Sequence, residues 1–129
     1  MGQSTRKLPK KLKTVAYICG RFSNGDTLPK EFQEELAKRF DVAMADLYRR
    51  GYAPLNPIAN DQNLWATRAI SYDVVLNCDL AIIKAVHDGG GVLYCLKGWQ
   101  DGHGSVKEWL FAKHIGMRIM YQRRRRNEG

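Results

Sequence analysis

Residues 13–25, KTVAYICGRFSNG, carry the strongest indication of the fold. The six residues after the opening lysine are apolar or β-forming, which is typical of a buried strand. The continuation from Gly20 to Gly25 has turn residues at each end and indicates a loop. A buried strand that leads into such a loop is a common opening of α/β domains, whose ligands bind at the carboxyl ends of the strands.

The segments that follow alternate between helix and strand. Apolar residues near helical spacing predict a helix from about Pro29 to Arg50, which Gly51 ends. A short strand over residues 52–55 comes next, and Asn56-Pro57 ends it.

The middle of the chain allows two interpretations. Residues 64–78 have apolar side chains at helical spacing. The next eight residues, Asp79–Val86 (DLAIIKAV), form either a third strand with Asp79 at its mouth or a continuation of the helix, because a short apolar run fits both. The glycines within residues 87–91 then require a turn.

The last third of the chain returns to strand and helix. Residues 92–96 indicate a strand, residues 98–104 (GWQDGHG) a second loop, residues 105–115 a helix and residues 117–121 a final strand. This alternation predicts one α/β domain over residues 13–121. We expect it to be Rossmann-like or flavodoxin-like, in three layers, with a mostly parallel sheet of about five strands.

Much of the net charge of +8 lies in basic runs at the two ends of the chain. We interpret residues 1–12 as a basic, flexible N-terminal segment and residues 122–129 as a basic tail. Such runs are usually solvated. We therefore favour solvated tails over nucleic-acid binding, which is the alternative.

The sequence gives no sign of a membrane segment or a metal site. No apolar run approaches the roughly 20 residues that cross a bilayer. The basic N-terminus lacks the apolar stretch of a secretory signal, so we expect a cytoplasmic protein. Cys19, Cys78 and Cys95 form no CxxC pair and lie among apolar residues, which predicts buried reduced thiols. The three histidines lack metal-ligand spacing.

The first loop can be interpreted as a phosphate site or as an ordinary turn. Gly20 would let the backbone approach a ligand closely, and Arg21 could hold a phosphate through two hydrogen bonds. The loop matches neither GxGxxG nor GxxxxGK, so no dinucleotide or Walker motif, and no cofactor, is indicated. A strand-to-helix turn with a solvated arginine fits equally well.

The second loop leads into Ser105-Val106-Lys107-Glu108. This spacing is that of a capping box, with Ser105 as the N-cap and Glu108 at the third helical position. The position also suits catalysis, because the helix dipole favours the ionised form of a carboxylate in the first turn. A rigid anionic carboxylate is what a glycosyl-transfer nucleophile requires. Glu108 is therefore the leading candidate nucleophile, and the two roles are compatible.

Glycosyl transfer also needs a second carboxyl group, which protonates the leaving base or orients the sugar. Asp79 is the first choice, because a strand mouth would direct it into the cleft. Each aspartate could instead be solvated or cap a helix. The other candidates are Asp73, Asp88 and Asp101.

Two aromatic residues lie where they could contact a base or a sugar. Trp99, beside Gly98 in the second loop, is the better ligand candidate. Tyr17 lies inside the first strand, where aromatic side chains more often belong to the core.

Four motifs, in their order along the chain, resemble the nucleoside 2-deoxyribosyltransferase-like superfamily. The likeness is greatest to its small phage and bacterial branch, which includes nucleoside monophosphate N-glycosidases. Together the motifs extend over residues 13–121. They are YICGRF (17–22), RGYAPLNP (50–57), NCDLAII (77–83) and GWQDGHG (98–104), the last followed by Glu108 and Ala112.

The resemblance implies a Rossmann-like or flavodoxin-like fold with Glu108 as the catalytic glutamate and Asp79 as its accompanying aspartate. It implies a sugar or phosphate contact from the loop Gly20-Arg21-Phe22. It also implies a homodimer or larger homo-oligomer whose active sites borrow residues from a neighbour. The family's activities are base exchange on deoxynucleosides and hydrolysis of nucleoside monophosphates. Further candidate substrate-binding residues are Tyr17, Asp73, Asp88, Trp99, Gly102, Gly104 and Ser105.

Two features depart from the family pattern. The family runs from its "CD" strand directly into its "GW" loop, whereas residues 87–96 intervene here. Either these form an inserted hairpin, or Asp79 matches an upstream helix aspartate and Asp88 stands near the "CD" position. Gly102 stands near the place of a family serine, for which Ser105 is a candidate substitute.

The leading hypothesis is cleavage or transfer at the N-glycosidic bond of a nucleotide, with Glu108 attacking the anomeric carbon or stabilising its oxocarbenium character. Arg21 and the helix N-terminus near Gly104 favour a substrate with a 5′-phosphate. A module that binds or sequesters a nucleotide without turnover is the alternative, and a nucleic-acid-binding protein is the third hypothesis. The base, the sugar and the acceptor, which is water or a second base, stay open.

Overall fold

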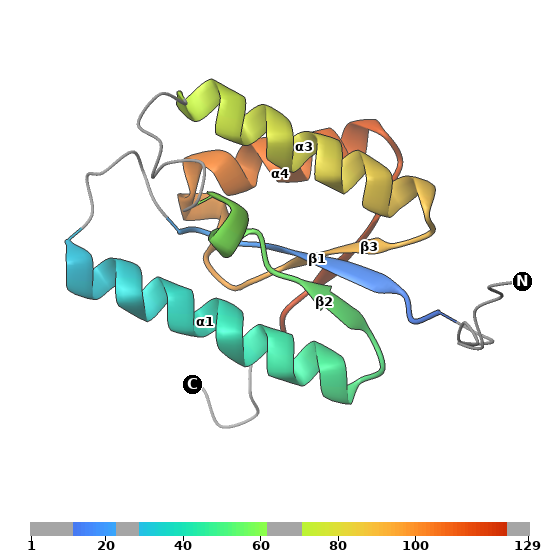
Figure 1. The fold of residues 1–129 in the computed structure, drawn as a ribbon, viewed down its shortest axis with the longest axis horizontal. Coiled ribbons are helices and arrows are strands. Elements are labelled where there is room, and N and C mark those ends of the chain that lie inside the picture. The colour runs from blue at the N-terminus through green and yellow to red at the C-terminus, as the bar shows by residue number, and fades with distance from the viewer. Residues whose placement is uncertain (1–11, 23–28, 62–70, 124–129) are drawn as a thin grey trace, which may run out of the picture.

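The computed structural model describes residues 12–22, 29–61 and 71–123, and in them the chain forms an α/β fold. Helices lie on both faces of a sheet of four strands, rather than the expected five or so, in a Rossmann-like three-layer arrangement (Figure 1). The strands are β1 (Val15–Cys19), β2 (Ala53–Leu55), β3 (Val92–Cys95) and β4 (Arg118–Tyr121). The helices are α1 (Lys30–Arg49), α3 (Tyr72–Asp88), the 3₁₀ turn η1 (Trp99–Asp101) and α4 (His103–His114).

The sheet has the strand order β2-β1-β3-β4, and every neighbouring pair is parallel. From β1 the chain moves outward to β2 and then returns to the other side of β1 to form β3. The order therefore reverses between β1 and β3. In open parallel sheets the crevice at such a reversal, at the carboxyl ends of the strands, is where ligands bind.

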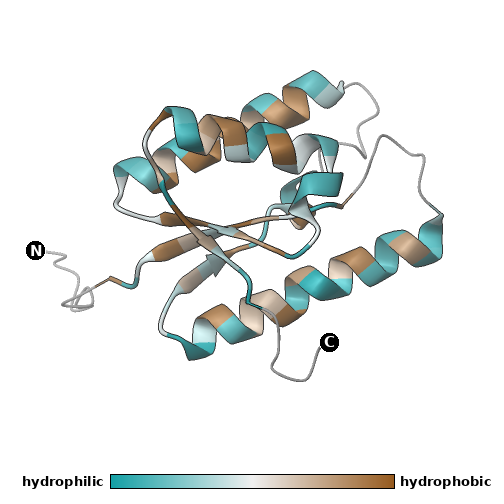
Figure 2. Cartoon of the chain, turned by 180° about the vertical axis from the view of Figure 1, so that it is seen from behind, coloured by the Kyte–Doolittle hydropathy of each residue, from teal (hydrophilic) through white to brown (hydrophobic). Residues whose placement is uncertain are grey.

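Strand β1 lies at the centre of the core, and its residues from Ala16 to Cys19 are fully buried. Ala16 and Ile18 pack with the apolar face of α1, whereas Tyr17 and Cys19 pack with side chains of α3 and α4. Burial on both faces explains the nearly continuous apolar run in this part of the sequence. Figure 2 shows hydrophobic and hydrophilic segments alternating along the helices on both sides of the sheet.

Residues 79–86 are helical, so the continued helix is confirmed and the third strand at this position is wrong. Helix α3 begins after Ser71, whose side chain accepts a hydrogen bond from the Val74 amide at 3.4 Å. Its buried residues recur every three or four positions, which is the period of a helix face and not of a strand. They are Val75, Asp79, Ile83 and Val86. Asp79 therefore lies in the middle of a helix, and the sheet has no strand after it until β3.

Some predictions fall outside the described residues. These are most of both basic ends, the second half of the first loop, and the start of the helix expected over residues 64–78. Within the described part of the chain, no helix is both long and apolar enough to cross a membrane. All three cysteines are free; Cys19 and Cys95 are buried, and Cys78 is half-buried.

Gly91, directly before β3, provides a test of the packing between α3 and the sheet. A Cβ atom there would overlap Val86 Cγ1 and lie 2.6 Å from the Val15 carbonyl oxygen. We expect Gly91→Ala to lower the free energy of unfolding by about 2 kcal/mol or more, because helix and strand must separate. The matched control is Gly89→Ala, whose Cβ would meet no atom closer than 3.6 Å. Equal urea denaturation midpoints for the two variants would contradict this packing.

Candidate active site

A cavity of about 230 Å³ lies at the carboxyl ends of β1 and β2, beside the reversal in strand order. The loop after β1, the residues after β2, the first half of α3 and the first half of α4 form its walls. A cavity of this kind suits a small molecule. The lining side chains that carry a charge or a hydroxyl are Arg21, Asp61, Tyr72, Asp79, Ser105 and Glu108.

Glu108 is held in this cavity by a hydrogen bond from the central strand. It lies on the face of α4 that packs against the sheet, together with Ser105 and Ala112, at positions three and four residues apart. The Tyr17 hydroxyl donates a hydrogen bond of 2.6 Å to Glu108 Oε2. The Cys19 thiol, two residues along the same strand, donates to the Ser105 carbonyl at 3.3 Å. Side chains of β1 thus fix both the first turns of α4 and the Glu108 carboxyl.

The Glu108 carboxyl titrates far above its usual range. Only 6% of the residue is exposed, and burial raises its pKa from 4.5 to about 8. The charge of Asp79 raises the pKa further, while the hydrogen bond from Tyr17 lowers it. Because Glu108 lies in the second turn of α4, the helix dipole does not offset desolvation as the sequence suggested. At neutral pH most of the carboxyl therefore carries a proton.

Two aspartates share the cavity with Glu108. Asp79 projects from the middle of α3 and is 5% exposed, and Asp61 lies in the helical turn that follows β2. Burial is the main cause that raises the pKa of both residues. Interaction with Asp79 adds to the effect on Asp61, whose pKa reaches about 9, whereas Asp61 lowers the pKa of Asp79. Asp61 therefore carries a proton at neutral pH, and the hydrogen bond between the two side chains places that proton between the two carboxyl groups.

The two glycine-containing loops meet at Gly102. A Cβ atom on Gly102 would overlap Ser105 Oγ and lie 2.9 Å from Arg21 Cα, so a side chain there would push the loops apart. Arg21 is the one basic residue among the described residues of the cavity wall, and its guanidinium lies 5.1 Å from the Phe32 ring centroid. The first residues of α4 line the same cavity. Their free amide groups and the arginine both favour an anion at this place.

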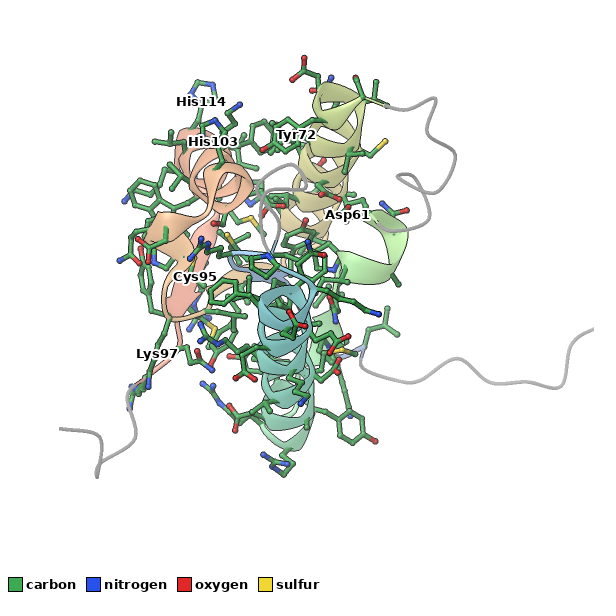
Figure 3. All side chains as sticks on the ribbon, turned by 90° about the vertical axis from the view of Figure 1, so that its left-hand side faces the viewer. Asp61, Tyr72, Cys95, Lys97, His103 and His114 are labelled. Carbon is green, nitrogen blue, oxygen red and sulfur yellow. The ribbon has the colours of Figure 1, made fainter. Side chains whose placement is uncertain are left out.

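Tyr72 extends the cavity wall across the gap between two helices. Figure 3 shows its side chain, at the start of α3, directed toward α4. The Tyr72 hydroxyl lies 3.2 Å from where a Cβ atom on Gly104 would be, so the glycine leaves this hydroxyl room. Burial raises the pKa of Tyr72, and Glu108 adds to the effect, so the phenol stays a hydrogen-bond donor at neutral pH.

Unpaired polar atoms gather at this cavity. In the described part of the chain, four buried side-chain atoms have no hydrogen-bond partner, and all four belong to residues of the cavity wall. They are Arg21 Nε, Asp61 Oδ1, Tyr72 OH and Asp79 Oδ1. Such an atom costs about 1–3 kcal/mol, and folded proteins leave few of them. Their concentration in one place makes this cavity the strongest candidate in the described part of the chain for a site that binds a polar ligand.

The structure brings most of the predicted site residues to the wall of this cavity and leaves four outside it. Trp99 stacks on Trp109, with ring centroids 5.0 Å apart, and is not part of the cavity wall. Asp73 is exposed in the first turn of α3, and Asp88 pairs with Lys84 at the far end of that helix, 2.8 Å away. Tyr17 lies behind Glu108. In the cavity wall are Gly20, Arg21, Phe22, Asp79, Gly102, Gly104, Ser105 and Glu108.

The predicted capping box is wrong. Helix α4 begins at His103 with Gly102 as its N-cap, two residues earlier than the sequence suggested. The single O–H of Ser105 is shared between the carbonyl oxygens of Trp99, at 2.5 Å, and Gly102, at 3.1 Å. Ser105 therefore ties η1 to the start of α4 instead of capping the helix.

Sequence reasoning missed Asp61 and Tyr72. Tyr72 could have been found from its spacing, because Tyr72, Val75 and Asp79 lie three and four residues apart and so share one face of a helix. An aspartate on this otherwise apolar face indicates a site, and Tyr72 lies on the same face. Asp61 carries no comparable signal, because it follows β2 in the polar stretch Asn60–Asn63, and only the fold brings it to Asp79.

Comparison with known proteins identifies no relative of this chain. No protein-family model, curated protein or solved structure matches the chain. Within the described residues, no group of three or more His, Cys, Asp or Glu side chains is arranged to hold a metal ion.

The raised pKa of Glu108 has a consequence for stability. Between pH 4.5 and about 8 the unfolded chain loses this proton and the folded protein keeps it, so the free energy of unfolding falls as pH rises. Glu108→Gln removes this dependence and can still accept from Tyr17. We expect the variant to be more stable than wild type by at least about 1 kcal/mol at pH 7.5, with little difference near pH 4.

The matched control is Glu35→Gln on the exposed face of α1, for which no such pH-dependent gain is expected. Thermal denaturation from pH 4 to 8 measures all three proteins. A Glu108→Gln variant less stable than wild type throughout this range would contradict the buried, protonated carboxyl.

Proposed function

We propose that the protein cleaves or transfers at the N-glycosidic bond of a nucleotide, with Glu108 as the nucleophile. The observation that carries the proposal is the carboxyl cluster: Glu108, oriented by Tyr17, shares a cavity with the Asp61–Asp79 pair. Glycosyl transfer needs two carboxyl groups with different protonation states. One must attack the sugar and the other must give a proton to the departing base.

In the proposed reaction the ionised Glu108 carboxylate forms a bond to the anomeric carbon. The electron pair of the breaking C–N bond goes to the base, which takes the proton held between Asp61 and Asp79. The glycosyl ester on Glu108 is then released by water, which gives hydrolysis, or by a second base, which gives transfer. The attacking water or base gives its proton back to the aspartate pair as the bond to the anomeric carbon forms. The Tyr17 hydroxyl positions the carboxylate through its 2.6 Å hydrogen bond.

The anion-favouring part of the cavity supports a nucleotide over a bare nucleoside. Arg21 presents an unpaired, buried Nε, and the start of α4 adds backbone amide groups beside it. A phosphate there would satisfy groups that the protein leaves without partners. The resemblance to the nucleoside 2-deoxyribosyltransferase-like superfamily agrees with this assignment. It adds the proposal of a homo-oligomer.

The second candidate function is binding of a nucleotide without turnover, which the same unpaired groups favour. It needs Arg21 and the start of α4 but no ionisable carboxyl pair. The measurements below separate it from catalysis, because only an enzyme releases free base.

Free base, separated by chromatography after incubation with ribo- and deoxyribonucleoside monophosphates, measures the proposed activity. We expect Glu108→Gln to lower its rate roughly 10³-fold or more, because the amide cannot form the glycosyl ester. Glu35→Gln serves again as the control and should retain the wild-type rate. Nucleotide binding without base release by wild type would leave the binding module as the function.

The pH dependence of base release follows from the two pKa values. Glu108 must be ionised, and its pKa is about 8; the aspartate pair must hold its proton, and the pKa of Asp61 is about 9. The rate should rise as pH approaches 8 and fall above about 9. A rate that is highest at pH 5 and falls steadily toward pH 8 would refute these roles, since Glu108 is protonated at pH 5.

A further inference from the structure

The pair formed by Asp61 and Asp79 leaves two oxygen atoms for which the protein provides no partner. Asp61 Oδ1 and Asp79 Oδ1 are both buried and unpaired, and both residues line the cavity. Asp79 as a whole is only 5% exposed, so bulk water reaches little of this side chain. Each oxygen needs an N–H or O–H donor from a ligand.

The balance of donors and acceptors in this pair defines the ligand group. Two carboxyl groups that share one proton have three oxygen atoms without hydrogen and a single O–H. With the proton held between the two groups, the pair offers the cavity acceptors only. It therefore fits a group with two N–H bonds and disfavours a carbonyl oxygen at the same place.

The neighbours of the pair favour the base of a nucleotide over its sugar. Pro57 and Ile58 precede Asp61 in the turn after β2, and Val75 and Leu76 lie one helical turn before Asp79. These apolar side chains line the cavity beside the two carboxyl groups. A planar base fits such walls, whereas sugar hydroxyls would lose hydrogen bonds to water there.

We propose that Asp61 and Asp79 bind the exocyclic amino group of a nucleotide base, so that the site prefers adenine or cytosine nucleotides to their oxo counterparts. This inference rests on the proposed function, since it places a nucleotide in the cavity. As the glycosidic bond breaks, the proton of the pair moves to the ring nitrogen next to that amino group, which takes the electron pair of the C–N bond into the ring.

The inference can be tested with pairs of nucleotides in which one base has an exocyclic amino group and the other has an oxo group at the same position. These are dAMP against dIMP and dCMP against dUMP, titrated calorimetrically into the Glu108→Gln protein, which prevents turnover. We expect the amino partner to bind about tenfold tighter in at least one pair, because an oxo group leaves the buried oxygens unpaired. Equal or tighter binding of the oxo partner in both pairs would overturn the inference, as would no binding at all.

Asp61→Asn, introduced into the Glu108→Gln protein, provides a second and independent test. The amide places an N–H donor where the carboxyl had an acceptor, so the amino preference should shrink or reverse. Asp41→Asn, exposed on α1, is the matched control and should keep the preference. An unchanged preference in a folded Asp61→Asn protein would contradict recognition by the pair.

A further comparison, of AMP with dAMP, separates the base from the sugar. Tighter binding of AMP that disappears in Asp61→Asn would show that the pair binds the sugar hydroxyls, which overturns the inference. Failure of the proposed function looks different: the amino preference is present, yet wild type releases no base. Conversely, release of amino and oxo bases at equal rates, with equal affinities, supports the function and refutes the base preference.

Discussion

The hydrogen bond from Tyr17 to Glu108 joins the first strand of the sheet to its last helix, across 91 positions of the sequence. The site depends on this contact. A fully buried tyrosine on the central strand cannot move without disturbing the core between the sheet and helices α3 and α4. The carboxyl that it holds is therefore fixed relative to β1, and everything else in the cavity is arranged around that point. The same tyrosine is thus both a core residue and a part of the site.

Burial determines the electrostatic state of the cavity. Three carboxyl groups, on α3, α4 and the turn after β2, lie close enough for each to alter the titration of another. Desolvation favours the neutral carboxyl groups and raises the free energy of each ionised carboxylate. A protein that needed only stability would place amides or apolar side chains here. Several carboxyl groups with raised pKa values in one cavity are typical of functional sites.

Glycine has a specific structural role in joining the two halves of the cavity. Gly102 lets the backbone of the loop after β1 approach the start of α4, which brings Arg21 beside the helix amides. An anion-favouring region and an acid cluster then lie in one small cavity. A nucleotide combines the same features, a phosphate and a weakly basic ring, within one molecule. The unpaired buried atoms of the wall suggest where each part of it would bind.

The sequence by itself determined the α/β class, the central strand, the two loops and the helix that carries Glu108. Each of these is a local pattern, such as an apolar run, a glycine or a helical period. Residues 79–86 stayed ambiguous because their apolar run fits strand and helix alike. The structure shows a helix there, in which buried residues recur every three or four positions from its start at Tyr72. Only the tertiary structure decided which charged residues meet. Asp61 and Asp79 lie 18 positions apart on different elements, and nothing in a local pattern encodes their contact or the desolvation that couples them. Trp99 is the opposite case. Its position beside Gly98 in a predicted loop favoured a ligand contact, but in the structure its ring stacks on Trp109 and is not part of the cavity wall.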